Sequence, residues 1–191
     1  MKREYISSES WLDSCMLPEK IGEEEFLEMW NLHPKEKGKV MVYGEKEIPR
    51  YQQSYLRDYT FSGVNSVSLP LPLIFKKYLD WVNSIPEYQG KFNQVLLNWY
   101  EGCHYIGRHS DSESQLMPNS PIVTISLGAE RTFRIRNREN KIVKDVITKD
   151  GLVLVMGGKF QKEFKHEIVK ITGKKAETIG RRISITFRQF L

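Results

Sequence analysis

The stretch PIVTISLGAERTFRIR, residues 121–136, contains two runs rich in β-branched and aromatic residues, with a glycine turn between them. Runs of this kind favour β-strands. Others lie on both sides of it: QVLLNWY at 94–100, GLVLVM at 151–156, HEIVKI at 166–171 and RRISITFRQF at 181–190. Many short strands separated by turn residues are typical of a β-sandwich or a double-sheet jelly roll. We therefore predict a β-domain from residue 93 onward, with a polar, basic loop over 170–182.

The beginning of the chain has a different pattern. From Ser10 to Leu32 it is acidic, with apolar residues at helical spacing, and it ends near the His33-Pro34 dipeptide. A proline disfavours helical backbone at the residue before it, so we predict one or two short helices that end here.

A basic, turn-rich segment and a second helical pattern follow. Residues 33–63 contain short strand-like pieces around VMVYG, which predicts a hairpin and a lid that faces the substrate. The segment LPLIFKKYLDWVNSI, 71–85, predicts a helix that packs on a sheet through a face formed by Leu73, Tyr78, Trp81 and Val82.

Length and composition limit the class of protein. A chain of 191 residues, 40% hydrophobic and 28% charged, is expected to fold as one globular domain, acting as a monomer. No apolar run has the length of a membrane helix and the first residues lack a secretory pattern, so we expect an intracellular protein, nuclear or cytoplasmic, without membrane contact. Cys15 and Cys103 form no C-x-x-C pair, which argues against a disulfide framework or structural zinc. The net charge of +5 favours polyanionic partners only weakly.

One histidine stands in a sequence that suggests a metal site, His109-Ser110-Asp111. Residues two apart in an extended segment point to the same side, so His109 and Asp111 can reach one ion. His166 is the candidate third ligand, because a later strand of the same sheet can bring it alongside. Two imidazoles and one carboxylate form the facial triad of non-haem Fe(II) oxygenases. An H-x-D sequence is also common in solvated turns, so the assignment depends on the surrounding motifs.

Those motifs resemble the AlkB family. In chain order they are Asn98, Tyr100 and Gly102; His109, Asp111 and Glu113; Ser126 and Gly128; His166; and Arg182 and Arg188. The resemblance extends from about Met41 to the end of the sequence, and is strongest to the members that repair alkylated double-stranded DNA, in VYGEKEIPRYQQ, YTFSG and SPIVTISLG.

The resemblance implies a mainly β fold with flanking helices (α+β). Its core would be a double-stranded β-helix, that is, a jelly roll, with an N-terminal substrate-binding lid. Residues 1–191 would then form one dioxygenase domain, with the helices and the nucleotide-recognition lid over 1–92 and the catalytic core over 93–191.

The resemblance also implies two cofactors, Fe(II) and 2-oxoglutarate. The catalytic metal ligands would be His109, Asp111 and His166, and 2-oxoglutarate would be bound by Asn98, Tyr100, Arg182 and Arg188. A guanidinium matches a carboxylate in a planar, bidentate pair, and alternation along RISITFR puts positions 182, 184, 186 and 188 on one strand face. Without the triad, the same arginines would be interpreted as a solvated basic edge.

The implied reaction is oxidative dealkylation of DNA bases of the N1-methyladenine and N3-methylcytosine type. It uses O2 and releases formaldehyde, succinate and CO2. A base in a duplex must be flipped out to reach such a site. By resemblance, Phe61 would stack on the base, Tyr59 and Glu113 would contact its edge, and Tyr43 would enter the base stack, where relatives have phenylalanine. The same patterns also fit core packing for Phe61 and a solvated turn for Glu113.

Cations in the basic segment and in the last third of the chain are expected to hold the phosphates of alkylated DNA: Lys35, Lys37, Lys39, Arg50, Lys159, Lys162, Lys165, Lys174 and Lys175. Three alternatives remain open. They are the same chemistry on RNA or single-stranded nucleic acid, a jelly roll that binds nucleic acid without turnover, and oxidation of a protein or small molecule. The complete triad and the arginine pair argue against the second.

Overall fold

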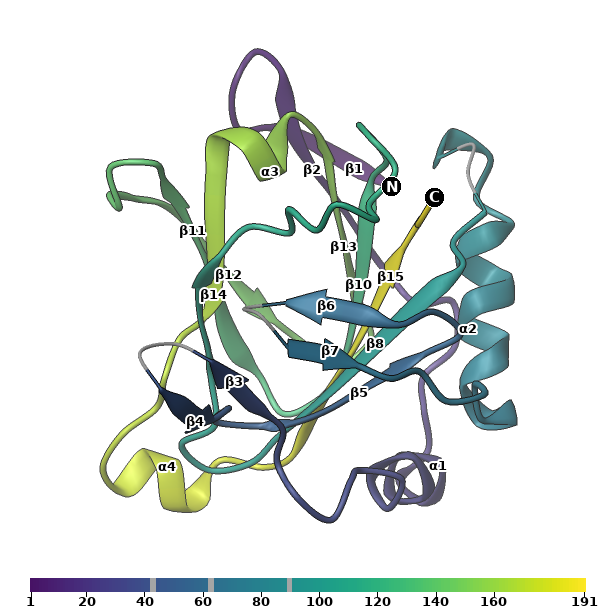
Figure 1. The fold of residues 1–191 in the computed structure, drawn as a ribbon, viewed down its shortest axis with the longest axis vertical. Coiled ribbons are helices and arrows are strands. Elements are labelled where there is room, and N and C mark those ends of the chain that lie inside the picture. The colour runs from purple at the N-terminus through teal and green to yellow at the C-terminus, as the bar shows by residue number, and fades with distance from the viewer. Residues whose placement is uncertain (42–43, 62–63, 89–90) are drawn as a thin grey trace.

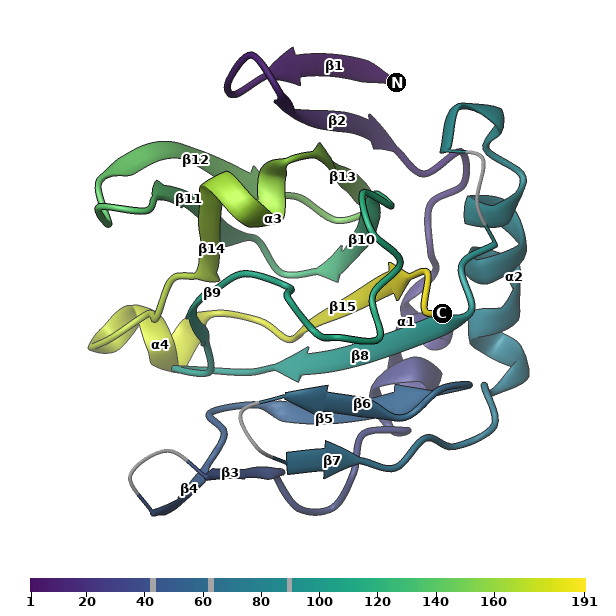
Figure 2. The ribbon, with the colours of Figure 1, turned by 45° about the horizontal axis from the view of Figure 1, so that its top comes forward.

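The computed structural model describes residues 1–41, 44–61, 64–88 and 91–191. Its centre is a seven-stranded sheet in the order β1-β2-β13-β10-β15-β8-β5, and a four-stranded sheet in the order β12-β11-β14-β9 lies across from it (Figures 1 and 2). Neighbouring strands are antiparallel in both sheets. The expected fold, mainly β with two antiparallel sheets as in a jelly roll, is confirmed.

The large sheet draws strands from both halves of the chain. Its members are β1 (Lys2–Tyr5), β2 (Ser10–Met16), β13 (Leu152–Gly158), β10 (Ile122–Gly128), β15 (Arg182–Arg188), β8 (Gln94–Tyr100) and β5 (Tyr51–Tyr55). The small sheet contains β12 (Ile142–Thr148), β11 (Arg131–Asn137), β14 (Phe164–Ile168) and β9 (Ile106–His109). Two hairpins stand apart, β3 (Lys39–Met41) with β4 (Glu45–Glu47) and β6 (Tyr59–Phe61) with β7 (Val64–Ser66).

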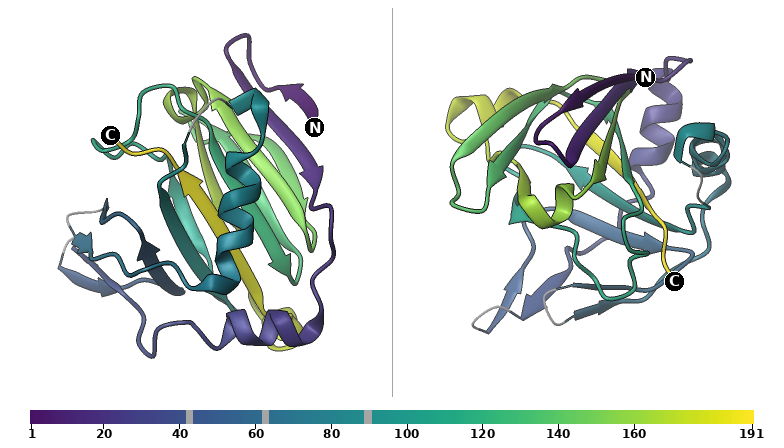
Figure 3. Two further views of the ribbon diagram at one scale, coloured as in Figure 1. Left: turned by 90° about the vertical axis from the view of Figure 1, so that its right-hand side faces the viewer. Right: turned by 90° about the horizontal axis from the view of Figure 1, so that it is seen from above.

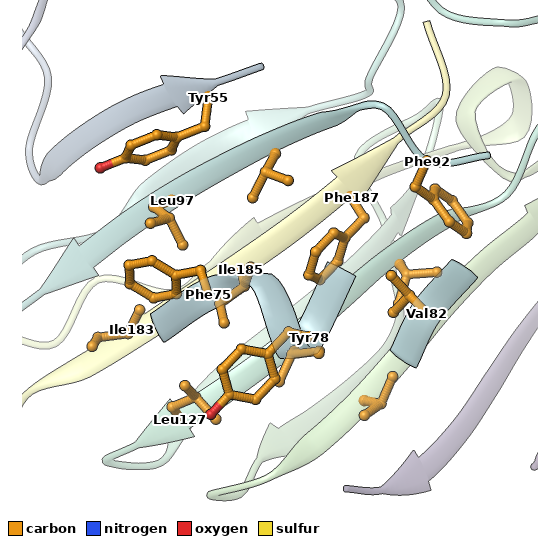
Figure 4. Packing of buried hydrophobic residues seen from close by; sticks show 14 of the residues in the cluster. Tyr55, Phe75, Tyr78, Val82, Phe92, Leu97, Leu127, Ile183, Ile185 and Phe187 are labelled. Carbon is orange, nitrogen blue, oxygen red and sulfur yellow. The ribbon is translucent and has the colours of Figure 1, made fainter. Parts of the chain in front are cut away.

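Helices α1 (Glu23–Trp30) and α2 (Leu73–Asn83) cover the outer face of the large sheet, and Figure 3 shows α2 lying across its strands. Phe75, Tyr78 and Val82 of α2 are at most 4% exposed. Figure 4 shows them packed against Leu97 and Ile185 of the sheet. Burying a side chain of this size contributes about 1.5–3 kcal/mol, so this layer fixes the sheet from behind. The remaining helices are short: η1 (Pro86–Tyr88), α3 (Phe160–Glu163) and α4 (Lys174–Thr178).

Successive side chains of two central strands, β8 and β15, lie alternately in the hydrophobic core and in a cavity. Successive side chains of a strand point to opposite faces. On β8, Val95, Leu97 and Trp99 belong to the helix-side core, whereas Asn98 and Tyr100 line a cavity between the sheets. On β15 the helix side takes Ile183, Ile185 and Phe187, and the cavity side takes Arg182, Ser184, Thr186 and Arg188. The predicted face of RISITFR is thus confirmed.

Some predictions for the first half were wrong. Of the one or two short helices expected between Ser10 and Leu32, one is present as α1, but the first part, Ser10–Met16, is strand β2, because it pairs with β13 along its whole length. Leu73 is 84% exposed, because it begins α2 on the side away from the sheet, and Phe75 packs in its place. The expected loop over 170–182 contains the short helix α4.

Strands at the margins were not anticipated. On β12, an edge strand, Ile142, Val143 and Ile147 remain exposed, so no buried face marks the strand in the sequence. β1 and β2 also extend the large sheet without having been predicted. The strands and hairpin predicted within residues 33–63 are present as the β3–β4 hairpin and as β5, which joins the large sheet. In the described part of the chain, none of the helices is long and apolar enough to cross a membrane.

Candidate active site

A cavity of about 470 Å³ lies between the two sheets and opens toward the β6 hairpin. Strands β8 and β15 form one wall and β9 and β14 the other, so its polar lining comes from segments far apart in the sequence. Burial of so many polar groups between sheets is costly unless they bind something.

His109, Asp111 and His166 meet at one end of this cavity. The predicted strand pairing is confirmed, because β14 lies beside β9 with His166 opposite His109, and their ring centroids are 4.2 Å apart. One ligand atom of each residue lies within 4.8 Å of the others, and no second cluster of this kind occurs among the residues that the structure describes. This spacing suits a single ion bound on one face.

The free atoms of these side chains fit a metal. Asp111 Oδ2 and His166 Nδ1 are buried without a hydrogen-bond partner. His109 Nδ1 is 2.9 Å from the carbonyl oxygen of Gly107, which can only accept, so the proton is on Nδ1 and Nε2 is left as a ligand atom. Burial lowers the pKa of His109 and lowers that of His166 to about 3, which keeps both imidazoles neutral and able to bind.

Asp111 is held from two directions. Arg188 Nη2 donates to Oδ1 at 2.6 Å, in a pair that is almost fully buried. Burial raises the pKa of Asp111, but the charge of Arg188 and its hydrogen bond outweigh it, so the pKa lies below its usual range and the carboxylate stays ionised. On the backbone side, Gln161 Oε1 accepts from Asp111 N at 2.9 Å. The carboxylate is thus charged and fixed before any ion arrives.

At the other end of the cavity lies Arg182, which is 1% exposed. Its Nη2 donates to Ser126 Oγ at 2.8 Å, and its guanidinium carbon is 4.9 Å from the centroid of the Tyr100 ring. Nε and Nη1 are buried and have no hydrogen-bond partner within the described structure. These unpaired N–H groups leave a buried guanidinium with free donors for an anionic ligand such as a carboxylate.

The mouth of the cavity carries aromatic rings and a carboxylate. Tyr59 OH donates to Glu113 Oε1 at 2.6 Å, whereas Glu113 Oε2 is buried without a partner. Phe61 stacks on Tyr59 with ring centroids 5.2 Å apart. The guanidinium carbon of Arg188 also lies over the Tyr59 ring, 4.9 Å from its centroid. The structure thus brings Tyr59, Phe61 and Glu113 to the same cavity as the histidines.

Comparison with known proteins identifies this arrangement. Residues 25–188 match the 2OG-Fe(II) oxygenase superfamily. The chain belongs to that superfamily. As a member it is an Fe(II)- and 2-oxoglutarate-dependent dioxygenase, and the triad and the unpaired Arg182 fit the two cofactors in charge and donor type.

The relatives narrow the family further. The chain is 30% identical over 166 residues to the DNA oxidative demethylase ALKBH2 of Homo sapiens, covering 80% of this chain and 61% of that protein. It is 30% identical to ALKBH2 of Mus musculus, covering 80% of this chain and 67% of the relative. The chain therefore spans about two thirds or less of the relatives' length. A solved structure, that of OsALKBH1, shares the fold with a TM-score of 0.56 and 20% identity, over 92% of this chain and 97% of that one. Membership of the AlkB family is confirmed.

Two residues of this oxygenase site were missed or misplaced by sequence reasoning. Arg50 was expected to hold phosphate, but it is 6% exposed and lines the cavity, because it directly precedes β5 and continues the buried alternation of Gln52 and Ser54. That polar alternation was the available signal. Gln161 carried no signal, because its contact with Asp111 depends on the turn at α3.

The other predicted cations and the finger residue lie elsewhere. Tyr43 is outside the described residues. Lys37 pairs with Glu47 and Lys159 with Glu9. The remaining lysines lie at or near the surface: Lys35, Lys39, Lys162, Lys165, Lys174 and Lys175.

Proposed function

We propose that this oxygenase removes alkyl groups from the bases of DNA by oxidation. The observation that supports it best is the composition of one cavity, which holds a metal triad at its floor and the Tyr59–Glu113 pair with Phe61 at its mouth. Bases methylated at N1 of adenine or N3 of cytosine are cationic, flat and apolar on their faces. Aromatic rings and an unpaired carboxylate oxygen are complementary to such a base.

The binding roles follow from position. Fe(II) is bound by His109, Asp111 and His166. Arg182 would pair with one carboxylate of 2-oxoglutarate, and Asn98 and Tyr100 would donate to the same molecule, while Arg188 keeps Asp111 in place. Bound Fe(II) supplies the activation of O2, at the expense of the decarboxylation of 2-oxoglutarate to succinate and CO2.

The substrate side of the reaction needs no protein nucleophile. One oxygen atom of O2 is inserted into a C–H bond of the N-methyl group, and the other ends in succinate. The N-hydroxymethyl product then breaks its N–C bond, releasing formaldehyde and leaving the unmodified base. Phe61 and His109 stack on the two faces of the flipped base, and Tyr59 and Glu113 bind its edge. The chain's task is to place the methyl carbon at the metal and exclude other groups.

We further propose that the preferred substrate is duplex DNA and that the enzyme acts as a monomer. Val40 of the β3–β4 hairpin and Tyr59 to Phe61 of the β6–β7 hairpin line the cavity, and in this proposal the two hairpins serve as the nucleotide-recognition lid of a single domain. The segment with Tyr43 connects β3 to β4, where an apolar side chain fills the gap left by the flipped base.

Mass spectrometry of oligonucleotides tests the proposal. Strands containing N1-methyladenine or N3-methylcytosine, alone and annealed to their complements, are incubated with enzyme, Fe(II), 2-oxoglutarate and ascorbate. The expected product is lighter by one methylene group, with one succinate formed for each methyl group removed. Demethylation of RNA alone would replace DNA as the substrate. Succinate formation without demethylation of any strand would contradict the proposal.

A further inference from the structure

Arg50 is a buried cation in the cavity that no cofactor assignment uses. It immediately precedes β5 and is 6% exposed. Its Nε donates to Asn98 Oδ1 at 2.6 Å, and its Nη2 donates to Gln52 Oε1 at 2.7 Å. Both acceptors are neutral amides, although a buried guanidinium usually pairs with a carboxylate. The position must therefore serve a purpose that compensates for burying the charge.

The contact with Asn98 fixes which way its amide faces. An arginine side chain has only donors, so the atom of Asn98 that faces Nε must be the amide oxygen. The amide NH2 group then faces away from Arg50. Asn98 lies on the cavity face of β8, opposite Ser184 of β15 and next to Tyr100. Two N–H donors are thus presented on the side of the cavity wall that leads to β15.

Strand pairing explains why an arginine suits this position. β5 pairs with β8 so that Gln52 lies opposite Asn98. The planar fork of Arg50 bonds to both amides at once through Nε and Nη2, which a lysine ammonium on a flexible stem cannot reproduce. Without that fork, the amide of Asn98 could turn over and present its oxygen to an anionic ligand.

We propose that Arg50 is a positioning residue for the cosubstrate, holding the Asn98 amide so that its N–H groups donate to an oxygen of 2-oxoglutarate. The inference rests on the cosubstrate role proposed above for Asn98. It replaces a phosphate contact for Arg50, which is too buried to reach the backbone of a nucleic acid.

A double-mutant cycle on cosubstrate binding tests this. The dissociation constant of 2-oxoglutarate is measured by calorimetry on Fe(II)-loaded protein without oxygen, for Arg50→Met, Asn98→Ala and the double variant. Loss of one hydrogen bond to a charged ligand weakens binding about tenfold, so each single variant should bind about tenfold more weakly. Because Arg50 acts through Asn98, the double variant should bind no more weakly than Asn98→Ala alone. Multiplied losses, about a hundredfold, or no loss in Arg50→Met, would overturn the proposal.

Two controls separate positioning from loss of charge or of fold. Arg108 is an exposed cation at the cavity lining, and Arg108→Met should leave the dissociation constant unchanged. Fe(II) affinity, measured separately, should be unaffected in Arg50→Met, whereas collapse of the site would weaken it too. If Arg50→Met does not fold, Arg50→Lys, which keeps the charge but not the fork, should show the same loss. If the double-mutant cycle gives the expected dissociation constants but the enzyme demethylates no base, the proposed substrate is contradicted and the role of Arg50 is not.

Discussion

Arg182 is a buried cation with unpaired donors, so its surroundings favour the binding of an anion. It keeps two unpaired N–H groups in a cavity where Asp111 is already bonded to Arg188. We predict that Arg182→Gln raises the 2-oxoglutarate concentration needed for half-maximal turnover by about 10- to 150-fold, which corresponds to roughly 1.5–3 kcal/mol for a charge-assisted pair. A cosubstrate titration measures this.

The neighbouring residue provides a matched control for that titration. Arg181 points away from the cavity, with its guanidinium 4.7 Å from the centroid of the Trp30 ring and its side chain half exposed. Arg181→Gln should titrate like the unmodified protein. Equal shifts for the two variants would mean that net charge, and not contact with the cosubstrate, sets the affinity.

Gln161 positions a metal ligand through the backbone. We predict that Gln161→Leu weakens Fe(II) affinity by about 10- to 100-fold, as outer partners of metal ligands commonly do, because Asp111 N then has no acceptor. Gln161→Glu keeps an acceptor oxygen at the same reach and should retain the affinity. Anaerobic metal titration compares the three proteins, and unchanged binding in Gln161→Leu would show that the loop holds Asp111 without this contact.

At the residue level, motif spacing predicted which side chains the fold brings together, because each lies on a strand with a strict period of two. Asn98, Tyr100, Arg182 and Arg188 reach the cavity for that reason. Arg50 and Gln161 could not be placed in the same way. The contacts of Arg50 depend on how β5 joins the sheet edge, which only the polar alternation at 50, 52 and 54 indicates. Those of Gln161 depend on a four-residue helix that has no pattern of its own in the sequence.

At the level of elements, strands that are buried on both faces were predicted and edge strands were not. β8, β10 and β15 read as continuous apolar or alternating runs because helices cover one side and the cavity lies on the other. β2 was mistaken for a helix because its neighbouring acidic residues have helical spacing, and its true partner, β13, is more than a hundred residues away in the chain.

The contact between β2 and β13 predicts a large effect of one methyl group. A Cβ on Gly157 would lie 2.0 Å from the Trp11 ring. Gly157→Ala should therefore lower the free energy of unfolding by about 1–3 kcal/mol, the usual cost of overpacking. Gly107→Ala adds the same methyl group where nothing lies within 4 Å, and should change stability little. Urea unfolding of both variants checks this. Equal stabilities would show that β2 and Trp11 can shift to accommodate the methyl group at little cost.

Variants in the two hairpins of the proposed lid, β3–β4 and β6–β7, are expected to differ in their effect on activity. Tyr43, if it fills the gap left by a flipped base, offsets an unstacking cost that single strands do not incur, so Tyr43→Ala should impair duplex repair selectively. If Phe61 holds the base after flipping, as proposed, Phe61→Ala should reduce kcat/KM on duplex and single strand alike, by about 1–3 kcal/mol. Both variants are assayed on one methylated oligonucleotide, with and without its complement. Equal losses on both forms for Tyr43→Ala would contradict the finger role.

For the whole molecule, the buried histidines predict a dependence of stability on pH. The pKa of His166 falls from 6.5 to about 3 on folding, and that of His109 is also lowered, so the unfolded chain binds more protons below about pH 6.5. Stability of the metal-free protein should therefore be highest above pH 6.5 and decrease as the pH falls toward 3. Asp111 acts in the same direction at lower pH, because its pKa is lowered as well.

Urea midpoints at pH 7.5 and 5.5 measure this effect. Fe(II), added without oxygen, should raise the midpoint more at pH 7.5, because protons compete with the metal for the imidazoles. A midpoint for metal-free protein that is the same at both pH values would mean that the histidines take up protons in the folded state without penalty.

The position of β15 in the sheet has a consequence for how the chain is made. This strand joins β10 to β8, yet it follows both of them in the chain by more than fifty residues. Until residues 182–188 are synthesised, β8 and β10 each lack one of their two neighbours in the sheet, which is β15. The strands on either side of β15 then cannot form a closed cofactor site. Contacts this distant in sequence also form slowly. During synthesis the nascent chain is therefore expected to expose unpaired strand edges and to depend on chaperones, and it gains its capacity to bind iron and 2-oxoglutarate in one late step.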